Sequence, residues 1–382
     1  MLTLRSHESI DDIDATAWDA LAADDNPFVA HAFLAGLEQT GCIRSAFGWR
    51  AQHLTLHDGD ALVGAVPLYV KANSHGEYVF DWAWADAWER AGGDYYPKFL
   101  CAVPYSPVTG PRLLAGDGPD ADARRATLAK ALREVTDRTG LSSAHVDFLR
   151  AEDTNAFDDA WLARSDWQFQ WRNPGDWRDF RDYLDALTHK RRNAVRHERA
   201  QVAATGLECE FRDGGSLDAG EWRTLHHLYT HTFDEKGNTP TLTQDFFRHL
   251  GTAFPRHSHV AFARRAGGIV AGALFLSSRD TLYGRYWGAF DQVPGLHFEL
   301  CYYQGIDYCL RHGLARFEPG AQGLHKLARG FLPTRTHSRH YIADTRFRAV
   351  IRASLEREAA LLEAHGRELC EHSPFAERDA PT

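Results

Sequence analysis

VAFARRAGGIVAGALFLS, residues 260–277, decides the fold of this chain. Apolar residues dominate 260–265 and 269–277, and Ala266-Gly267-Gly268 lies between them, which predicts a β-hairpin. Further along we expect a strand at 281–290, a helix at 298–312 that ends at Gly313, and a strand at 314–318. The order hairpin, strand, long helix, strand predicts an α/β unit.

The first half of the chain repeats this order. Strands are expected around the turn Asp58-Gly59-Asp60, at 52–57 and 61–70, followed by a proline-interrupted strand at 106–114, a helix at 121–139 and a strand at 144–149. Helices precede the hairpin in both halves, at 13–21 and 32–40, and at 177–205, 222–233 and 243–253. We therefore expect an α/β (α+β) fold of two tandem domains with mixed central sheets, residues 1–165 and 166–382, the second ending in a helix at 341–364.

The composition is that of an average globular protein. The chain has 382 residues, of which 44% are hydrophobic and 25% charged. The longest purely apolar stretch, 269–276, is far shorter than the roughly 20 residues that a membrane helix needs. The N-terminus lacks a basic start followed by an apolar block, so we expect a cytoplasmic protein. The six cysteines include no C-x-x-C pair, which argues against a zinc ribbon or a disulfide scaffold.

Several common catalytic motifs are missing from the sequence. His226, His227 and His231 have a helical spacing, but the glutamate of H-E-x-x-H is lacking, so no metal site is expected. Neither a G-x-S-x-G elbow nor a G-x-x-x-x-G-K-[ST] loop occurs, which argues against serine hydrolases and P-loop NTPases.

Charge is distributed unevenly along the chain. The formal net charge is −9, and residues 1–165 hold 14 basic and 25 acidic residues, whereas the remainder holds 29 basic and 27 acidic residues. An anionic ligand therefore fits the second half better, and DNA is not expected as a partner. Only six of the basic residues are lysines, so a lysine within a motif is informative.

A basic stripe lies within the helix expected at 177–205. Arg192, Arg196 and Arg199 lie one turn apart and, with Lys190, have the spacing to grip phosphates. The alternative is a solvated face paired to nearby acids such as Asp185.

The start of the long helix near Gly295 is a second candidate anion site. Backbone N–H groups at a helix start can hold a phosphate, and we place His297 with this site. The alternative is an ordinary loop in which glycine supplies a positive φ. The equivalent start near Gly118 is flanked by Asp117 and Asp120, which disfavour phosphate.

The segment 317–333 follows the last core strand and carries the catalytic candidates. Glu318 ends that strand and can take a proton from an attacking amine. Lys326 can stabilise negative charge on a tetrahedral intermediate, and we place Tyr286, in the neighbouring strand, with them. The alternative is a structural ion pair between Glu318 and Lys326 or Arg329.

These segments resemble the FemAB/FemX-like aminoacyl transferases, which are tandem GNAT-fold proteins. His325-Lys326, with Phe331 after it, resembles the family's F-K-x-x-F-G region, and KRRNAVR at 190–196 resembles its K-x-R-x-x-[IV]-x-[RK] helix. YGRYWGA at 283–289 resembles the strand before the long helix. The aromatic segments 78–88 and 92–98 are similar to those of the FemAB-like group of predicted bacterial N-acyltransferases. This resemblance spans residues 10–350 and implies two GNAT-like (acyl-CoA N-acyltransferase) domains and a role in peptidoglycan biosynthesis or recognition.

Aromatic and acidic residues are dense in these segments of the first half. An acidic groove lined by aromatic rings suits an amine-bearing acceptor, and Asp81 or Asp86 can bind its ammonium group. The alternative is that the aromatic side chains pack between the two domains. The residues placed at the substrate are Asp81, Trp84, Asp86, Tyr95, Tyr105 and Arg329.

We therefore expect an N-acyltransferase in which an acceptor amine attacks an activated carbonyl without a covalent enzyme intermediate. Backbone N–H groups of 281–290 would polarise that carbonyl. The donor is an acyl-coenzyme A or an aminoacyl-tRNA, the basic stripe contacting RNA phosphates in the second case, and no bound prosthetic group is expected. The acceptor is a small molecule or a peptide that bears an amine. The alternative is a non-catalytic GNAT-like binding protein that recognises an envelope precursor or a protein partner.

Overall fold

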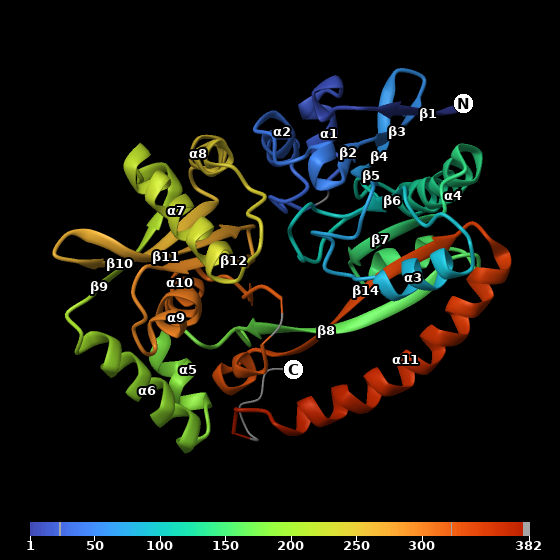
Figure 1. The fold of residues 1–382 in the computed structure, drawn as a ribbon. Coiled ribbons are helices and arrows are strands. Elements are labelled where there is room, and N and C mark those ends of the chain that lie inside the picture. The colour runs from blue at the N-terminus through green and yellow to red at the C-terminus, as the bar shows by residue number, and fades with distance from the viewer. Residues whose placement is uncertain (23, 322, 377–382) are drawn as a thin grey trace. The chain divides into compact units, whose positions relative to one another are not determined.

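The computed structural model describes residues 1–22, 24–321 and 323–376, and the chain divides into two compact units (Figure 1). Unit 1 comprises residues 1–167 and 335–365, and unit 2 comprises residues 168–334 and 366–382. Strands β8 (Leu162–Arg172) and β14 (Leu332–Ile342) and helix α11 (Thr345–Glu371) contribute residues to both units. The domain boundaries expected from the sequence stay a prediction.

Unit 1 holds a three-stranded sheet and a larger mixed sheet. The first has the order β1-β3-β4, and the second runs β2-β5-β6-β7-β14. Strands β6 and β7 are parallel, and helix α4 lies between them in the chain. The bounds are β1 (Leu2–His7), β2 (Trp49–Ala51), β3 (His53–Asp58), β4 (Ala61–Val66), β5 (Leu68–Lys71), β6 (Lys98–Cys101), β7 (Ser143–Leu149), α1 (Ala15–Asp19), α2 (His31–Gln39), α3 (Trp82–Arg90) and α4 (Ala121–Thr139).

Unit 2 holds a mixed sheet with the order β8-β13-β12-β11-β10-β9, in which β8 pairs with β13 through Trp171 and Arg172. Helix α7 packs on β11 and β12, and α10 contacts β12 and β13. The bounds are α5 (Phe180–Ala186), α6 (His189–Ala203), β9 (Glu208–Asp213), α7 (Ala219–Glu235), α8 (Gln244–Ala253), β10 (Ser258–Arg265), β11 (Gly268–Ser277), β12 (Thr281–Ala289), α9 (Leu296–Phe298), the π-helical turn η5 (Glu299–Tyr303), α10 (Gln304–His312) and β13 (Arg316–Glu318).

Local sequence explains the elements that position the site. Strands β10 and β11 join through Ala266 and Gly267, both of which have positive φ, as a tight hairpin turn requires. Asp218 and Glu221 form a reciprocal capping box at the start of α7. The helical segment 296–312 ends at Gly313, which is left-handed with φ of 68°. The mixed α/β class expected from the sequence is confirmed.

Four expected elements differ in the structure. The strand expected at 106–114 is wrong, because Gly110 and Leu114 make only isolated bridges. The strand that precedes α4 in the chain is β6. The strand expected at 61–70 divides into β4 and β5 at Pro67, which has no N–H to donate to a ladder. The helix expected at 177–205 is two helices, because Leu187 is extended with ψ of 149°. The last helix begins at Thr345 rather than at residue 341, because 341–342 still belong to β14.

Candidate functional site

Strand β12 of unit 2 leaves its parallel neighbour β13 after three paired positions. The pairs are Thr281 with Arg316, Leu282 with Phe317 and Tyr283 with Glu318, and β12 then continues to Ala289. The carboxyl end of this parallel pair lies where the two strands part. Ligands of open α/β sheets bind at such ends.

A β-bulge lies where β12 and β13 part. On β11, Leu274 pairs with Tyr286 and Phe275 pairs with Gly284, so Arg285 is the extra residue. A bulge twists the strand and re-aims its side chains, and bulges are common beside active sites.

The bulge reverses which side chains of β12 face each helix. Before it, Leu282 lies against Gly305 of α10. After it, Tyr286 packs edge-on against Tyr229 of α7, with ring centroids 4.9 Å apart, and Trp287 turns to His297 on the opposite side. The carboxyl half of β12 thus presents a different face from the one that a regular strand would present.

The loop after β13 passes closely over β12 at this point. A Cβ on Gly284 would lie 3.3 Å from Pro319 Cα, and one on Gly320 would lie 3.4 Å from the Gly284 carbonyl oxygen. Lys326 holds this loop, because its Nζ donates to the carbonyl oxygens of Gly320, at 2.6 Å, and Ala321, at 3.1 Å.

Lys326 itself is buried, with 3% of its surface exposed. Burial lowers the pKa of Lys326 to about 8, and the nearby Arg285 charge acts in the same direction, while Cys301 opposes them. An ammonium group of this pKa changes charge near neutral pH, which is typical of functional lysines.

Glu318 and Tyr286 lie on the two strands that diverge. Glu318 is half-buried and accepts a hydrogen bond from Gln170 Nε2 at 3.2 Å. The ion pair of Glu318 with Lys326 or Arg329 stays the alternative. The proposed catalytic roles of Glu318, Lys326 and Tyr286 stay predictions.

Gly295 begins the helical segment 296–312 in a left-handed conformation, with φ of 81°. Its Cα lies close to α6, since a Cβ there would be 3.3 Å from the Glu198 carbonyl oxygen. His297 is half-buried beside Trp287, and burial and then the neighbouring His325 lower its pKa to about 4. His297 is therefore neutral at physiological pH, and its role with a donor stays a prediction.

Internal partners occupy much of the basic stripe. Arg192 donates to the carbonyl oxygens of Leu184, Asp185 and Leu187 at the end of α5. Arg199 forms a two-pronged ion pair with Glu299, with both N–O distances at 3.0 Å. Lys190 and Arg196 remain exposed, so they are the members of the stripe that a phosphate can reach.

Arg329, expected at the substrate, is 7% exposed and bound within unit 2. Its guanidinium pairs with Glu198, donates to Tyr303 and His325, and lies 3.4 Å above the Phe298 ring centroid. This network ties α6 to the π-helical turn, a type of turn that is frequent at functional sites. Arg329 therefore links the elements that surround the site.

In unit 1, Asp81 and Tyr95 belong to a buried ionic cluster. Asp81 Oδ2 lies 2.5 Å from Lys98 Nζ and accepts from the Tyr95 hydroxyl at 2.6 Å. Lys98 also lies 2.8 Å from Glu77 Oε2. Burial would raise the pKa of Asp81, but the Lys98 charge outweighs burial and holds that pKa well below its usual range. Asp81 therefore already binds an ammonium group, that of Lys98.

The other residues expected at the substrate are spread over unit 1. Trp84 is buried and packs edge-on against His340, 5.0 Å between centroids. Asp86 is exposed on α3 and pairs with Arg90 at 2.6 Å. Tyr105 is buried, and its hydroxyl donates to the Cys42 carbonyl oxygen. Substrate-binding roles for these residues stay predictions.

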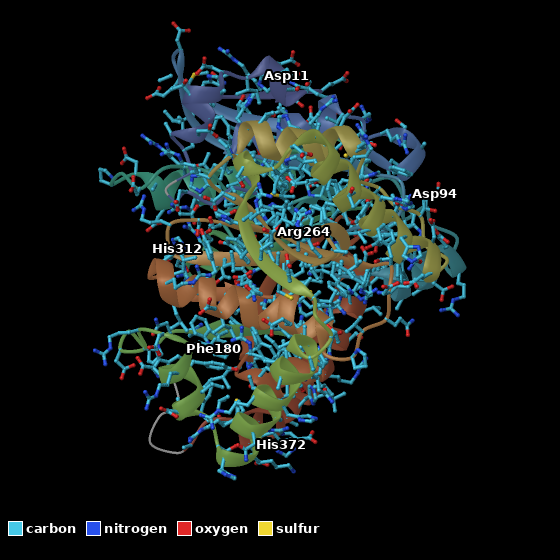
Figure 2. The ribbon with its side chains drawn as sticks, turned by 90° about the vertical axis from the view of Figure 1, so that its left-hand side faces the viewer. Asp11, Asp94, Phe180, Arg264, His312 and His372 are labelled. Carbon is cyan, nitrogen blue, oxygen red and sulfur yellow. The ribbon has the colours of Figure 1, made fainter. Side chains whose placement is uncertain are left out.

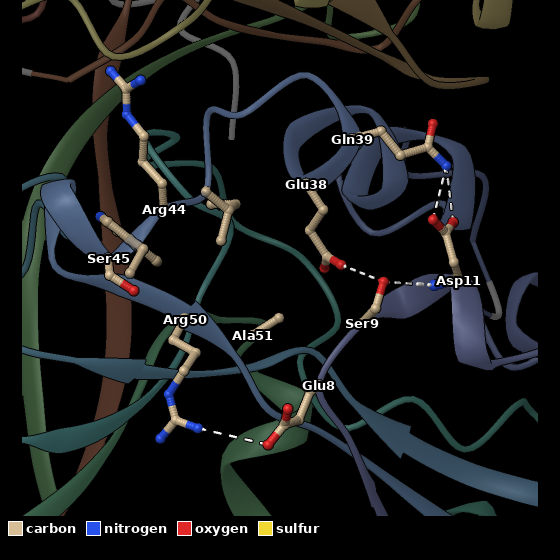
Figure 3. Close-up of a pocket in the computed structure, with 11 residues that line it drawn as sticks. Glu8, Ser9, Asp11, Glu38, Gln39, Arg44, Ser45, Arg50 and Ala51 are labelled. Carbon is tan, nitrogen blue, oxygen red and sulfur yellow. Dashed lines mark hydrogen bonds and ion pairs between the residues drawn. The ribbon is translucent and has the colours of Figure 1, made fainter.

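A hollow of about 350 Å³ opens on unit 1, lined by polar residues of both charges (Figure 3). Its groups largely satisfy one another. Glu38 accepts from Ser9, Gln39 donates to Asp11, and Arg50 lies 3.8 Å from Glu8.

The sequence interpretation missed most of the buried polar layer of unit 1. Lys71, Glu77, His145 and His340 lie there with Lys98, and His145 Nδ1 lies 2.7 Å from His340 Nδ1. One signal was available: Lys71, Lys98 and Lys326 are half of the six lysines, and all three are buried. The pairing of Lys98 with Asp81 depends on the fold of a loop and had no sequence signal.

Two features are absent from residues 1–22, 24–321 and 323–376. No helix in those ranges has both the length and the apolar character needed to cross a bilayer. No three side chains of His, Cys, Asp or Glu gather there as metal ligands.

A model of the FemAB-like family, described as peptidoglycan biosynthesis/recognition, matches residues 9–377. No curated protein matches the chain.

Solved structures share the fold at low sequence identity. FemX is 11% identical with a TM-score of 0.52, covering 91% of this chain and 100% of FemX. The C-terminal domain of a protein described as a lysylphosphatidylglycerol synthetase, from Agrobacterium fabrum, is 12% identical with a TM-score of 0.53, covering 91% and 97%. A conserved protein of unknown function from Bacteroides thetaiotaomicron is 12% identical with a TM-score of 0.50, covering 88% and 99%. The expected tandem GNAT-like fold is confirmed.

Proposed function

The chain belongs to the FemAB-like family, and from this membership we propose that it is an N-acyltransferase. It moves an acyl or aminoacyl group from an activated carrier, an acyl-coenzyme A or an aminoacyl-tRNA, to an amine acceptor. The acceptor is a small molecule or a peptide, and the role is in the biosynthesis or recognition of peptidoglycan. The observation that carries the proposal is the divergence of β12 from β13 at the bulge around Arg285.

The parallel strand pairs of the two units differ, and this difference favours unit 2 as the place of the donor. In unit 1 the chain after β6 fills the equivalent space, because Gly110 N donates to the Phe148 carbonyl oxygen at 3.1 Å. The buried Arg112 guanidinium donates to the Asp147 carbonyl oxygen at 2.9 Å. In unit 2 the pairing ends at Tyr283, the loop after β13 crosses β12 at Gly284, and β12 runs on to Ala289.

The reaction is acyl transfer to nitrogen. The acceptor nitrogen attacks the carbonyl carbon, the bond to the carrier sulfur or oxygen breaks, and the carrier leaves as a thiol or a hydroxyl after taking up a proton. Backbone N–H groups of β12 polarise the carbonyl, and the Lys326 ammonium stabilises negative charge that develops on its oxygen. Glu318 accepts the proton that the amine loses. Lys190 and Arg196 are the exposed cations for a phosphate-bearing carrier.

A non-catalytic binding protein is the second candidate. Lys326 favours it in one respect, because its Nζ already donates to Gly320 and Ala321. If Lys326 only holds the loop, its replacement would weaken ligand binding, and there would be no catalytic turnover to lose.

An assay for a new amide distinguishes the two functions. The full chain is incubated with a lysine amide acceptor and either acetyl-coenzyme A or a mixture of charged tRNAs, and products are detected by mass spectrometry. We expect an amide with one of the two carriers, and a loss of about 10²–10³ in kcat for Lys326→Met. The control is Lys130→Met, whose side chain is 65% exposed. Binding of both carriers without any amide would support the binding protein.

A further inference from the structure

The segment 373–376 of unit 2, which follows α11, returns to the corner between α5 and α6. His372, directly before the segment, and Phe180 of α5 lie in the same part of unit 2 (Figure 2). Leu187, at the corner, and Phe375 form an isolated antiparallel bridge. The neighbours of these two residues exchange backbone hydrogen bonds of 2.9 and 3.0 Å, so the backbone of the segment is fixed on the corner.

This bridge places the Phe375 ring inside unit 2. Phe375 is 4% exposed, and its ring centroid lies 5.5 Å from that of Trp177. The ring also lies against the backbone of Gly330, because a Cβ built there would be 2.8 Å from Phe375 Cζ and 3.3 Å from Tyr183 Cε2. Gly330 has φ of 86°, so this position requires glycine both for its conformation and for the space that the ring takes up.

Gly330 ends the short 3₁₀ turn η6 (Leu324–Arg329), which carries Lys326. The Gly330 N–H group donates to a carbonyl oxygen within the turn at 3.1 Å. Tyr183, the other neighbour of Gly330, donates its hydroxyl to the last carbonyl group of the turn at 2.9 Å. The Phe375 ring therefore packs on the carboxyl end of η6.

The position of η6 decides where the Lys326 ammonium group lies. Nζ of Lys326 donates to the carbonyl oxygens of Gly320 and Ala321 in the loop over β12. A 3₁₀ turn has poor internal hydrogen-bond geometry, so its place depends on the side chains that pack against its ends. Phe375 supplies such packing at one end of η6.

We propose that residues 373–376 are a strap that fixes η6, and that Phe375 is a positioning residue for the acyl transfer in which Lys326 takes part. Phe375 acts through Gly330 rather than on a reacting atom. Its part in catalysis rests on the proposed function, whereas the mechanical claim, that the strap holds η6, does not. A phenylalanine that only fills the core would lower stability without changing η6 in the folded protein.

Hydrogen exchange of the full chain tests the mechanical claim. Phe375→Leu keeps an apolar side chain but removes the ring atoms that reach Gly330, and we expect amides of 325–331 to exchange about tenfold faster. The matched control is Leu250→Ala, which removes a buried side chain from α8 and should leave exchange in 325–331 within about twofold of the wild type. Unchanged exchange in Phe375→Leu, or an equal increase in Leu250→Ala, would overturn the strap.

Steady-state kinetics test the part in catalysis. Phe375→Leu should lower kcat about tenfold and change KM for the amine less than about twofold, because a displaced Lys326 alters the reacting geometry rather than binding. An unchanged kcat would reject the positioning role and leave the proposed transferase standing. Faster exchange in 325–331 of the variant, without any amide from the wild type, would reject the transferase and leave the strap.

Gly330→Ala perturbs the same contact from the other side. Its Cβ would collide with the Phe375 ring, and its left-handed conformation adds strain. Leucine at 375 relieves the collision, so the double variant Gly330→Ala/Phe375→Leu should lose less kcat than the product of the two single losses. Losses that multiply would show that the two residues act independently, and would overturn the path from Phe375 through Gly330 to Lys326.

Discussion

Lys326 holds the loop that passes over β12, and its own side chain changes charge near neutral pH. Its pKa is lowered to about 8 by burial, so the side chain is protonated below that pH and neutral above it. If its ammonium stabilises the developing oxyanion, kcat must fall as pH rises through about 8. The measurement is the pH dependence of kcat at saturating substrates for the wild type and for Lys326→Arg.

The arginine variant separates this effect from other titrations. Arginine stays charged over the whole range, so the ratio of wild-type to variant kcat should decline above pH 8. A ratio that does not change with pH, or that increases above pH 8, would contradict the assigned role of Lys326.

Lys98 is the shared cation of the buried cluster in unit 1. Burial would lower its pKa, but the carboxylates of Glu77 and Asp81 outweigh burial and raise it. Lys98→Met leaves Asp81 buried without its counter-charge, and we expect a loss of about 3–5 kcal/mol in the free energy of unfolding. Urea denaturation measures it, with Lys130→Met, at an exposed position, expected within about 0.5 kcal/mol of the wild type. A loss below about 1 kcal/mol for Lys98→Met would mean that the cluster is not a buried ion pair in solution.

At the scale of residues, the rarity of a residue type helped to select site candidates. The contacts that each side chain makes could not be predicted from the sequence. The rarity of lysine singled out Lys326, which proved to be buried beside the divergent strands. Asp81 was singled out for an ammonium ligand, and its ammonium partner is Lys98. Spacing along one helix suggested a shared phosphate face for Arg192 and Arg199, whereas each reaches a different internal acceptor. Such contacts depend on tertiary packing, which local patterns do not encode.

Strand β12 and helix α7 approach each other as closely as backbone allows. A Cβ on Gly288 would collide with the Leu228 carbonyl group of α7. We therefore expect Gly288→Ala to displace the helix and to cost about 1–3 kcal/mol in stability. Thermal unfolding measures the loss. Gly268→Ala is the control, because a Cβ there meets its nearest atom at an ordinary 3.5 Å. Equal melting temperatures for the two variants would contradict the packing described.

Elements with regular apolar patterns were predicted well, and elements with polar buried faces were missed. The hairpin of β10 and β11 has apolar strands and a Gly-Gly turn, and its predicted bounds are close to the observed ones. Strand β14 buries Thr336, Ser338 and His340, so its sequence carries no apolar alternation. The bulge at Arg285 also had no sequence signal, because it depends on the register with β11.

At the scale of the whole molecule, the two units share an architecture and differ in what fills their parallel strand pairs. The order of elements along the chain was enough to predict the duplication, and the motifs at 190–196, 283–289 and 325–331 carried the family resemblance. It did not predict that β14 and most of α11 would pack in unit 1, because that association is between segments more than 150 residues apart. For the same reason, the sequence could not show which unit holds the donor.

The central claim is that the divergent strands of unit 2 hold the activated donor. Hydrogen exchange of the full chain, with and without saturating acetyl-coenzyme A or a non-hydrolysable aminoacyl-tRNA analogue, tests it most directly. One of the two carriers should slow exchange in residues 284–289 and 295–299 of unit 2 and leave residues 98–112 of unit 1 unchanged. Slowed exchange in 98–112 alone, or no change in either segment with either carrier, would contradict the account.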